Sequence, residues 1–154
     1  MKAFAGKLLI INLTNKKVSE EPIDESIAEN FLGGTGYSCR YLYDKIQEDT
    51  DPLSPENILM FMTGPFCGSN IPASGRFAVC AKSPLSGIWG ESSCGGYFGP
   101  ELKKARYDGI VIKGASNNPV YLEINENDVD IKDASSLWGK GIFETSKILK
   151  EKIG

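Results

Sequence analysis

Glycine and proline divide this chain into short segments, and this division limits the elements into which it can fold. The 154 residues include 17 glycines and 8 prolines. Many of them gather between short apolar runs, as in the segment 64–75 (GPFCGSNIPASG). Because both residues disfavour the interior of helices and strands, we expect short regular elements joined by turns.

Apolar runs of strand composition and apolar residues at helical spacing follow one another irregularly along the chain. The predicted strands are 6–13, 18–23, 58–63, 76–82, 88–90, 109–113, 120–124 and 129–131. The predicted helices are 25–32, 37–46, 98–107 and 142–152. This order lacks the regular strand–helix–strand alternation of a doubly wound sheet, so we predict an α+β fold with packed helices.

A hairpin followed by a helix is predicted near each end of the chain. The glycine-rich sequences GTGY (34–37) and CGGY (94–97) each precede a predicted helix. This likeness suggests an internal duplication, although it rests on few shared residues.

Composition and charge argue against several classes of function. The formal net charge is -3, whereas nucleic-acid-binding proteins normally carry a basic face. No apolar run approaches the roughly 20 residues that span a bilayer. The apolar N-terminal run passes directly into a polar turn and not into a signal-peptide cleavage site. We therefore expect a single cytoplasmic domain over residues 1–154 that binds neither nucleic acid nor a membrane.

The use of histidine and cysteine limits the chemistry further. The chain has no histidine, which removes Ser–His and Cys–His catalytic pairs and the commonest transition-metal ligand. Its cysteines, Cys39, Cys67, Cys80 and Cys94, form no Cys-x-x-Cys pair, so we expect reduced, buried structural thiols. Cys94 precedes a predicted helix, where the pKa of a thiol can fall. Without a base beside it we predict no nucleophile and no catalytic residue in this chain.

The segment 91–103, ESSCGGYFGPELK, is the main candidate for a ligand site. Gly95 and Gly96 precede a predicted helix, whose first N–H groups are unpaired and attract anions. Arg76, at the start of a predicted strand, could bind a phosphate or a planar acceptor through its forked guanidinium. Together these residues suggest a site for a large phosphate-bearing ligand. A plain glycine turn and a solvated surface arginine are the alternatives.

The middle of the chain also carries a series of motifs in a fixed order. They are DPLSPEN, GPFCG, GR, KSPLSG and GGYFGPELKKARYDGIVIKG, flanked by GKLLIINLTNKKV and FLGGTGYS before them and NPVYLEI and IKDASSLWGK after them. Over essentially its whole length the chain resembles the N-terminal domain of the aldehyde ferredoxin oxidoreductase family, the tungstopterin enzymes.

The resemblance implies a domain whose two β-sheets form the base of a metallopterin site. Enzymes of this family oxidise aldehydes to carboxylic acids and pass the electrons through a 4Fe-4S cluster to ferredoxin. Their tungsten or molybdenum is held by two pterins, a tungstopterin or molybdopterin pair whose phosphates share a magnesium ion.

The family pattern also implies roles for single residues. Arg76 lies between the pterin and the cluster, and Ser93 supplies its backbone carbonyl to the magnesium. The loop of Cys94, Gly95 and Gly96 contacts the pterin. This chain departs from the pattern, which has Asn at the position of Ser93 and Ser at that of Cys94. A backbone carbonyl survives the first change, so the implied magnesium role is only modestly weakened.

Enzymes of the family are several times longer than this chain, and their cluster cysteines lie in later domains that are absent here. We therefore expect a domain that is inactive alone. Its expected partners are the C-terminal domains of the parent protein, ferredoxin, and a second copy in a homodimer. The alternatives are a stand-alone phosphate- or nucleotide-binding module, a domain of a paralogue such as a benzoyl-CoA reductase subunit, and a purely structural domain.

Overall fold

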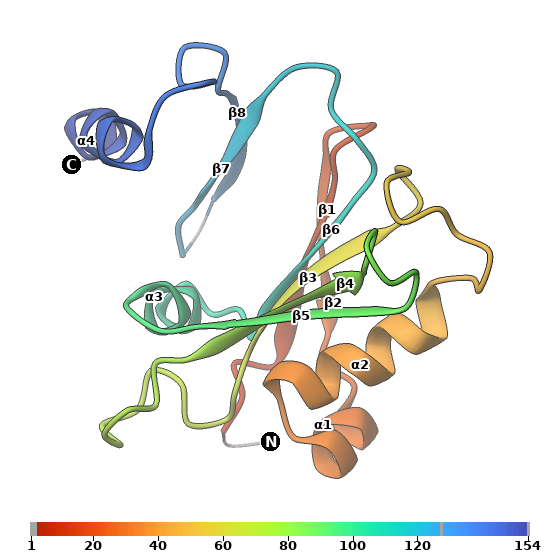
Figure 1. Ribbon diagram of the computed structural model, residues 1–154. Helices are drawn as coiled ribbons and strands as arrows, with labels where there is room; N and C mark the ends of the chain where they lie inside the picture. The colour runs from red at the N-terminus through yellow and green to blue at the C-terminus, as the bar shows by residue number, and fades with distance from the viewer. Residues whose placement is uncertain (1–2, 127, 154) are drawn as a thin grey trace.

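The computed structural model describes residues 3–126 and 128–153, which form four helices and eight strands (Figure 1). The strands are β1 (Lys7–Asn12), β2 (Lys17–Pro22), β3 (Ile58–Thr63), β4 (Phe77–Lys82), β5 (Trp89–Cys94), β6 (Gly109–Lys113), β7 (Val120–Ile124) and β8 (Val129–Asp133). The helices are α1 (Glu25–Phe31), α2 (Gly34–Lys45), α3 (Phe98–Lys104) and α4 (Ile142–Ile153). The α+β prediction is confirmed.

The strands form two sheets, as the resemblance implies. Six strands make a large sheet in the order β2-β1-β6-β3-β4-β5, while β7 and β8 pair with each other in a small one. In the large sheet β1 runs parallel to β6, and all other neighbours are antiparallel. The apolar run GIVIK forms β6, which lies between β1 and β3. Its residues are nearly all apolar because an inner strand that is covered on both faces needs no polar alternation.

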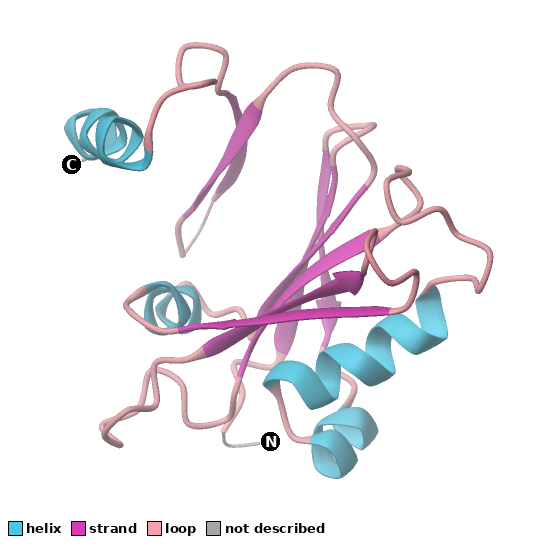
Figure 2. Ribbon diagram, in the orientation of Figure 1, coloured by secondary structure: helices cyan, strands magenta, loops and turns pink. Residues whose placement is uncertain are grey.

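Helices α1 and α2 cover one face of the large sheet (Figure 2). Successive strand residues point to opposite faces, so Leu8 and Ile10 of β1 and Met60 of β3 point toward the two helices. They pack with Tyr37 of α2, which is fully buried. We call this side of the sheet the covered face.

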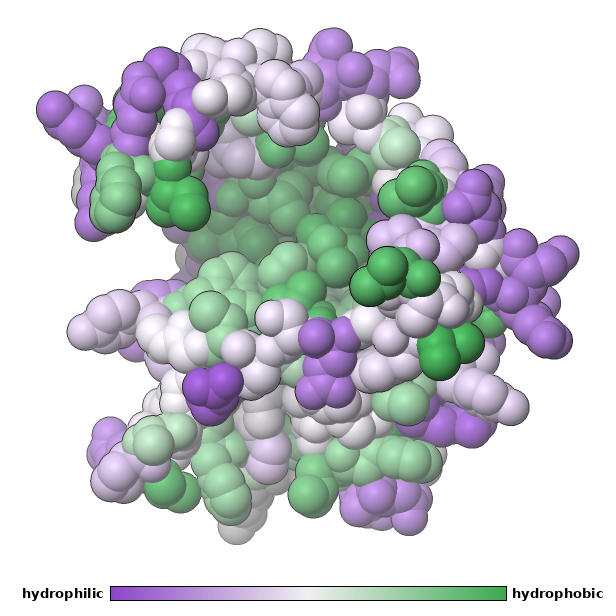
Figure 3. Space-filling model, viewed as in Figure 1, coloured by the Kyte–Doolittle hydropathy of each residue, from purple (hydrophilic) through white to green (hydrophobic). Residues whose placement is uncertain are grey.

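The opposite side, which we call the open face, is only partly covered. Leu102 of α3 packs on it, and the hairpin of β7 and β8 adds half-buried side chains such as Leu122 and Ile131. Figure 3 shows a hollow lined by apolar residues between α3 and this hairpin. Leu59 of β3 is 39% exposed and Phe98 of α3 is 43% exposed, so apolar surface remains accessible there.

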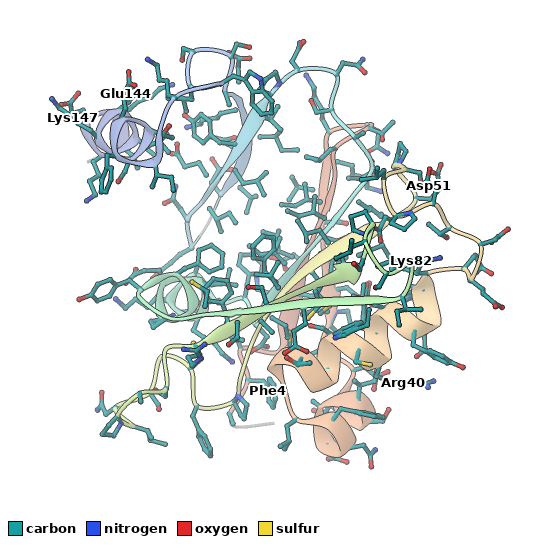
Figure 4. All side chains as sticks on the ribbon, in the orientation of Figure 1. Phe4, Arg40, Asp51, Lys82, Glu144 and Lys147 are labelled. Atoms are coloured by element: carbon teal, nitrogen blue, oxygen red, sulfur yellow. The ribbon has the colours of Figure 1, made fainter. Side chains whose placement is uncertain are left out.

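Helix α4 packs loosely at the end of the described chain and has no buried residue. Glu144 and Lys147, labelled in Figure 4, point away from the β7–β8 hairpin. Ile142 and Phe143 at the start of the helix are also exposed. Among the described residues, no helix combines the length and the apolar character that a membrane span requires.

The two hairpin-then-helix units have different surroundings. The β1–β2 hairpin belongs to the large sheet, whereas the β7–β8 hairpin forms a sheet of its own. GTGY lies in the first turn of α2, while CGGY spans the end of β5 and the turn that follows. The internal duplication therefore stays a prediction.

Candidate cofactor-binding site

The first part of the candidate segment lies on an edge strand, and the two glycines that follow it precede helix α3, as predicted. Ser92, Ser93 and Cys94, which lie beyond the predicted strand 88–90, are the last three residues of β5. Ser93 is paired with Ala78 of β4, and Cys94 with Phe77. The sequence hides this strand because its last four residues are all exposed, so no apolar alternation marks it.

Arg76 and Ser93 meet at one end of this edge. Arg76 immediately precedes β4, and its Nε donates a hydrogen bond to Ser93 Oγ at 3.1 Å. Its Nη2 donates to the backbone carbonyl of Ser93 at 3.2 Å. No carboxylate within the described ranges forms an ion pair with Arg76. The structure thus presents an exposed guanidinium whose charge is not compensated by a neighbouring acid.

Gly95 and Gly96 continue from β5 and leave their backbone open. A Cβ added at Gly95 would have only Arg76 Nη1 nearby, at 3.9 Å, and one added at Gly96 would meet nothing within 4 Å. Gly96 also has φ +92, a backbone angle that favours glycine. Arg76, Ser93 and the two glycines therefore form one exposed corner, which we call the Arg76 corner.

The contact of Cys94 with the Arg76 corner is a hydrogen bond to the backbone of Gly95. Strand alternation turns it to the face of β5 opposite Ser93, and its thiol donates a 3.5 Å hydrogen bond to the carbonyl of Gly95. All four cysteines are free, as predicted, but Cys39 and Cys94 are exposed and not buried. Burial raises the pKa of Cys67, and it raises the pKa of Cys80 to about 11.

Helix α3 is shorter than predicted and ends at Lys104. Arg106 adopts φ 66, and the N–H of Tyr107 bonds back to the carbonyl of Leu102 at 3.1 Å, which closes the helix. Pro100 lies in the first turn, where its missing N–H costs no helical hydrogen bond. Helix α3 has only seven residues. We therefore build the candidate site on Arg76 and the open glycine backbone and not on the N-terminus of this helix.

Two glycines that sequence reasoning did not single out, Gly75 and Gly99, fix the corner against α3. A Cβ at Gly99 would lie 2.8 Å from Cys67 Sγ and 3.0 Å from the carbonyl oxygen of Gly75, and a Cβ at Gly75 would lie 3.0 Å from the carbonyl oxygen of Gly96. The loop before β4 therefore packs backbone against backbone on α3. Only the density of glycines in this part of the sequence hinted at such a close approach.

A buried carboxylate, which sequence reasoning also missed, anchors α3 to the N-terminal segment. Asp108 is fully buried and accepts hydrogen bonds from the N–H groups of Ala5 and Gly6 at 2.9 and 2.7 Å. It also forms an ion pair with Lys103 of α3. Lys103 Nζ lies 5.0 Å from the ring centroid of Phe4, labelled in Figure 4. Within the described part of the chain no group of acidic and cysteine side chains could hold a metal ion by itself.

The chain has close relatives among known proteins. Its residues 8–154 match the family described as aldehyde ferredoxin oxidoreductase, N-terminal domain. It is 45% identical over 154 residues to the tungsten-containing aldehyde ferredoxin oxidoreductase of Pyrococcus abyssi, covering 100% of this chain and 25% of that protein. It is 40% identical over 157 residues to the aliphatic sulfonate oxidoreductase, WOR-like subunit, of Pyrococcus furiosus, covering 99% of this chain and 25% of that protein.

A solved structure supports the same relationship. A chain of the active site complex BamBC of benzoyl coenzyme A reductase, in complex with 1,5-dienoyl-CoA, matches with a TM-score of 0.96 and 38% identity, over 99% of this chain and 23% of that chain. The chain spans about one quarter of the length of the curated relatives named above. With its match over residues 8–154, the chain belongs to the aldehyde ferredoxin oxidoreductase family and corresponds to its N-terminal domain.

Proposed function

We propose that this domain supports the metallopterin of an oxidoreductase that oxidises aldehydes to carboxylic acids with ferredoxin as the electron acceptor. One observation carries the proposal: Arg76, with no acidic partner among the described residues, is held beside the Ser93 carbonyl and the open backbone of Gly95 and Gly96. The name of the relative from Pyrococcus abyssi, which says tungsten-containing, favours tungsten in the cofactor.

The donor and acceptor groups of the Arg76 corner fit a pterin pair whose phosphates share a magnesium ion. A guanidinium suits a phosphate or a planar acceptor, and the space above the glycines is open to a bulky group. The Ser93 carbonyl already accepts one hydrogen bond from Arg76. A carbonyl oxygen has a second lone pair, so the same atom can also serve a hard cation such as magnesium.

The chemistry is divided between this domain and its parent protein. The metallopterin would supply the two-electron redox step when bound. In this chain Arg76 would orient the cofactor, while the Gly95–Gly96 backbone would let it approach closely. Histidine is absent, so a proton-transferring histidine would have to come from elsewhere in the parent. We therefore expect no activity from this domain alone, and we place the 4Fe-4S cluster in the parent.

The open face supports a role for this domain within a larger protein. Its apolar hollow (Figure 3) would be covered by later domains of the parent. Exposed apolar side chains such as Leu59 and Phe98 would be buried by the same contact. Ferredoxin and a second copy of the parent remain proposed partners on the strength of the family alone.

A second candidate is a paralogue that acts on another substrate. The TM-score of 0.96 to a chain of a benzoyl coenzyme A reductase complex favours it, because the same domain fold then serves a different reaction. Assays of the purified parent with an aldehyde and with an aromatic coenzyme A thioester would separate the two. Oxidation of the aldehyde alone supports the first candidate, and turnover of the thioester alone supports the second.

The cofactor site can be tested by metal content. In the parent protein, Arg76→Ala and Gly95→Asp should lower the tungsten and pterin content per mole of protein by about tenfold, as expected for losing a charged hydrogen bond or adding a like charge beside a phosphate. Elemental analysis and pterin fluorescence measure both quantities. The control is Arg40→Ala, which removes a half-buried arginine that pairs with Asp44 on α2. Full tungsten and pterin content in both test variants would refute the site.

A further inference from the structure

The two hydrogen bonds between Arg76 and Ser93 use one particular edge of the guanidinium. Nε and Nη2 together form its side edge, and both donate to Ser93, one to the hydroxyl and one to the carbonyl. The outer edge, formed by Nη1 and the second N–H of Nη2, is left facing away from Ser93. Nη1 is also the atom that lies 3.9 Å from the Cβ position of Gly95. The guanidinium is thus oriented with its side edge toward Ser93 and its Nη1 atom toward Gly95.

We propose that the Ser93 hydroxyl is a positioning group that holds the side edge of Arg76, so that the outer edge presents a two-pronged donor to an oxyanion above Gly95 and Gly96. The two hydrogen bonds between Arg76 and Ser93 do not depend on the proposed function. The identity of the oxyanion as a cofactor phosphate does rest on it. This role belongs to the side chain of Ser93 and is separate from any role of its carbonyl.

The hydroxyl matters because Arg76 is exposed and has many rotamers. Ordering such a side chain costs about 2 kcal/mol of conformational entropy, and a single hydrogen bond to the carbonyl would still let the guanidinium plane rotate. Two acceptors on one residue fix that plane. Removing Oγ leaves Nε without its partner, so the outer edge would no longer be held over the glycines.

Ser93 itself is held by the strand. It is paired with Ala78 in the β4–β5 register. Two residues earlier, Glu91 accepts hydrogen bonds from Thr35 Oγ1 of α2 at 2.8 Å and from Trp89 Nε1 at 3.2 Å. The contact with Thr35 ties the exposed edge strand to α2, on the same side of the sheet as the Ser93 side chain, whereas Trp89 lies on β5 itself. The acceptor that positions Arg76 is therefore fixed in place.

The inference can be tested on the whole chain without loading a cofactor. In ¹⁵N-labelled protein the exchange of the Arg76 Nε–H with water is measured by NMR, with the side-chain signal of the exposed Arg106 as the internal reference. Exchange at Arg76 should be slowed in the wild type and should become about tenfold faster in Ser93→Ala, as one charged hydrogen bond is lost. Ser93→Thr, which keeps the hydroxyl, should restore slow exchange. Ser92→Ala, on the opposite face of β5, is the matched control and should change nothing.

Inorganic phosphate is the probe for the outer edge. It should shift the Arg76 side-chain signal in the wild type and in Ser92→Ala, with roughly fivefold weaker affinity in Ser93→Ala. Wild-type exchange at Arg76 as fast as at the exposed Arg106 would overturn the inference without any variant. So would an unchanged rate in Ser93→Ala, or no effect of phosphate on Arg76. If the exchange and phosphate results hold while Arg76→Ala keeps full tungsten in the parent, the positioning role stands and the proposed function fails.

Discussion

The two faces of the large sheet differ in how completely they are covered. On the covered face α1 and α2 bury a continuous core that includes Tyr37, Met60 and Cys80. On the open face α3 and the β7–β8 hairpin leave apolar residues such as Leu59 partly exposed. The covered face therefore contains the larger of the two buried clusters. The other keeps apolar surface for contacts that the isolated domain does not make, as large exposed apolar patches usually do.

The largest expected effect concerns the anchor that holds α3 on the open face. Asp108→Ala should lower the free energy of unfolding by about 3–5 kcal/mol, because it leaves Lys103 partly buried without its ion-pair partner. Urea unfolding followed by circular dichroism measures the change. Lys104→Ala is the control, since its ion pair with Glu101 is exposed and should contribute less than about 1 kcal/mol. Equal effects for the two variants would show that the open face has no strong anchor.

The comparison between the faces can be tested at two consecutive residues of β3. Met60 is fully buried on the covered face, and Leu59 is 39% exposed on the open face. Met60→Ala should cost about 2–5 kcal/mol of unfolding free energy through the cavity it leaves. Leu59→Ala should cost about 1 kcal/mol, because folding removes less of the apolar area of Leu59 from water than of Met60. Chemical unfolding of both variants decides the point, and a larger cost at Leu59 would reverse the assignment of the faces.

The smallest expected effect is a pH dependence that belongs to the covered face. Burial raises the pKa of Cys80 from 9.0 to about 11. The unfolded chain therefore loses this proton first, so the contribution of Cys80 to stability should fall as pH rises from 9 to 11. Melting temperatures of the wild type and Cys80→Ala across this range measure the change. Cys94→Ala, at an exposed cysteine, is the control and should leave the pH slope of the wild type unchanged. A slope that is the same in Cys80→Ala would contradict this prediction.

The inner elements could be predicted from the sequence more closely than the edges. The inner strands β3 and β6 begin and end at the predicted residues, because apolar runs bounded by turn residues mark such strands. β7 does so too, although it belongs to the two-stranded sheet, because its side chains are half-buried. β5 was largely missed, since an exposed edge strand can be polar throughout. The end of α3 was missed as well, because Arg106 fits a helix by composition while its φ of 66 ends the helix.

The candidate site shows the same difference. Arg76, Ser93 and the glycines were identifiable as residue types that suit a phosphate-bearing ligand. Their convergence was not, because it depends on the register of β4 with an edge strand that the sequence hides. The packing of Gly75 on Gly96 and the burial of Asp108 depend on contacts between distant segments. Local sequence patterns carry no information about such contacts.

The link between Asp108 and the N-terminal segment has a consequence for the synthesis of this protein. Ala5 and Asp108 are 103 residues apart in the chain, and β1 forms its parallel ladder with β6. At ribosomal speeds of about 5–20 residues per second, the first strand waits roughly 5–20 seconds for its partner. During that interval the hairpin of β1 and β2 has one unpaired apolar edge. The large sheet can close only after Gly109 to Lys113 has left the ribosome.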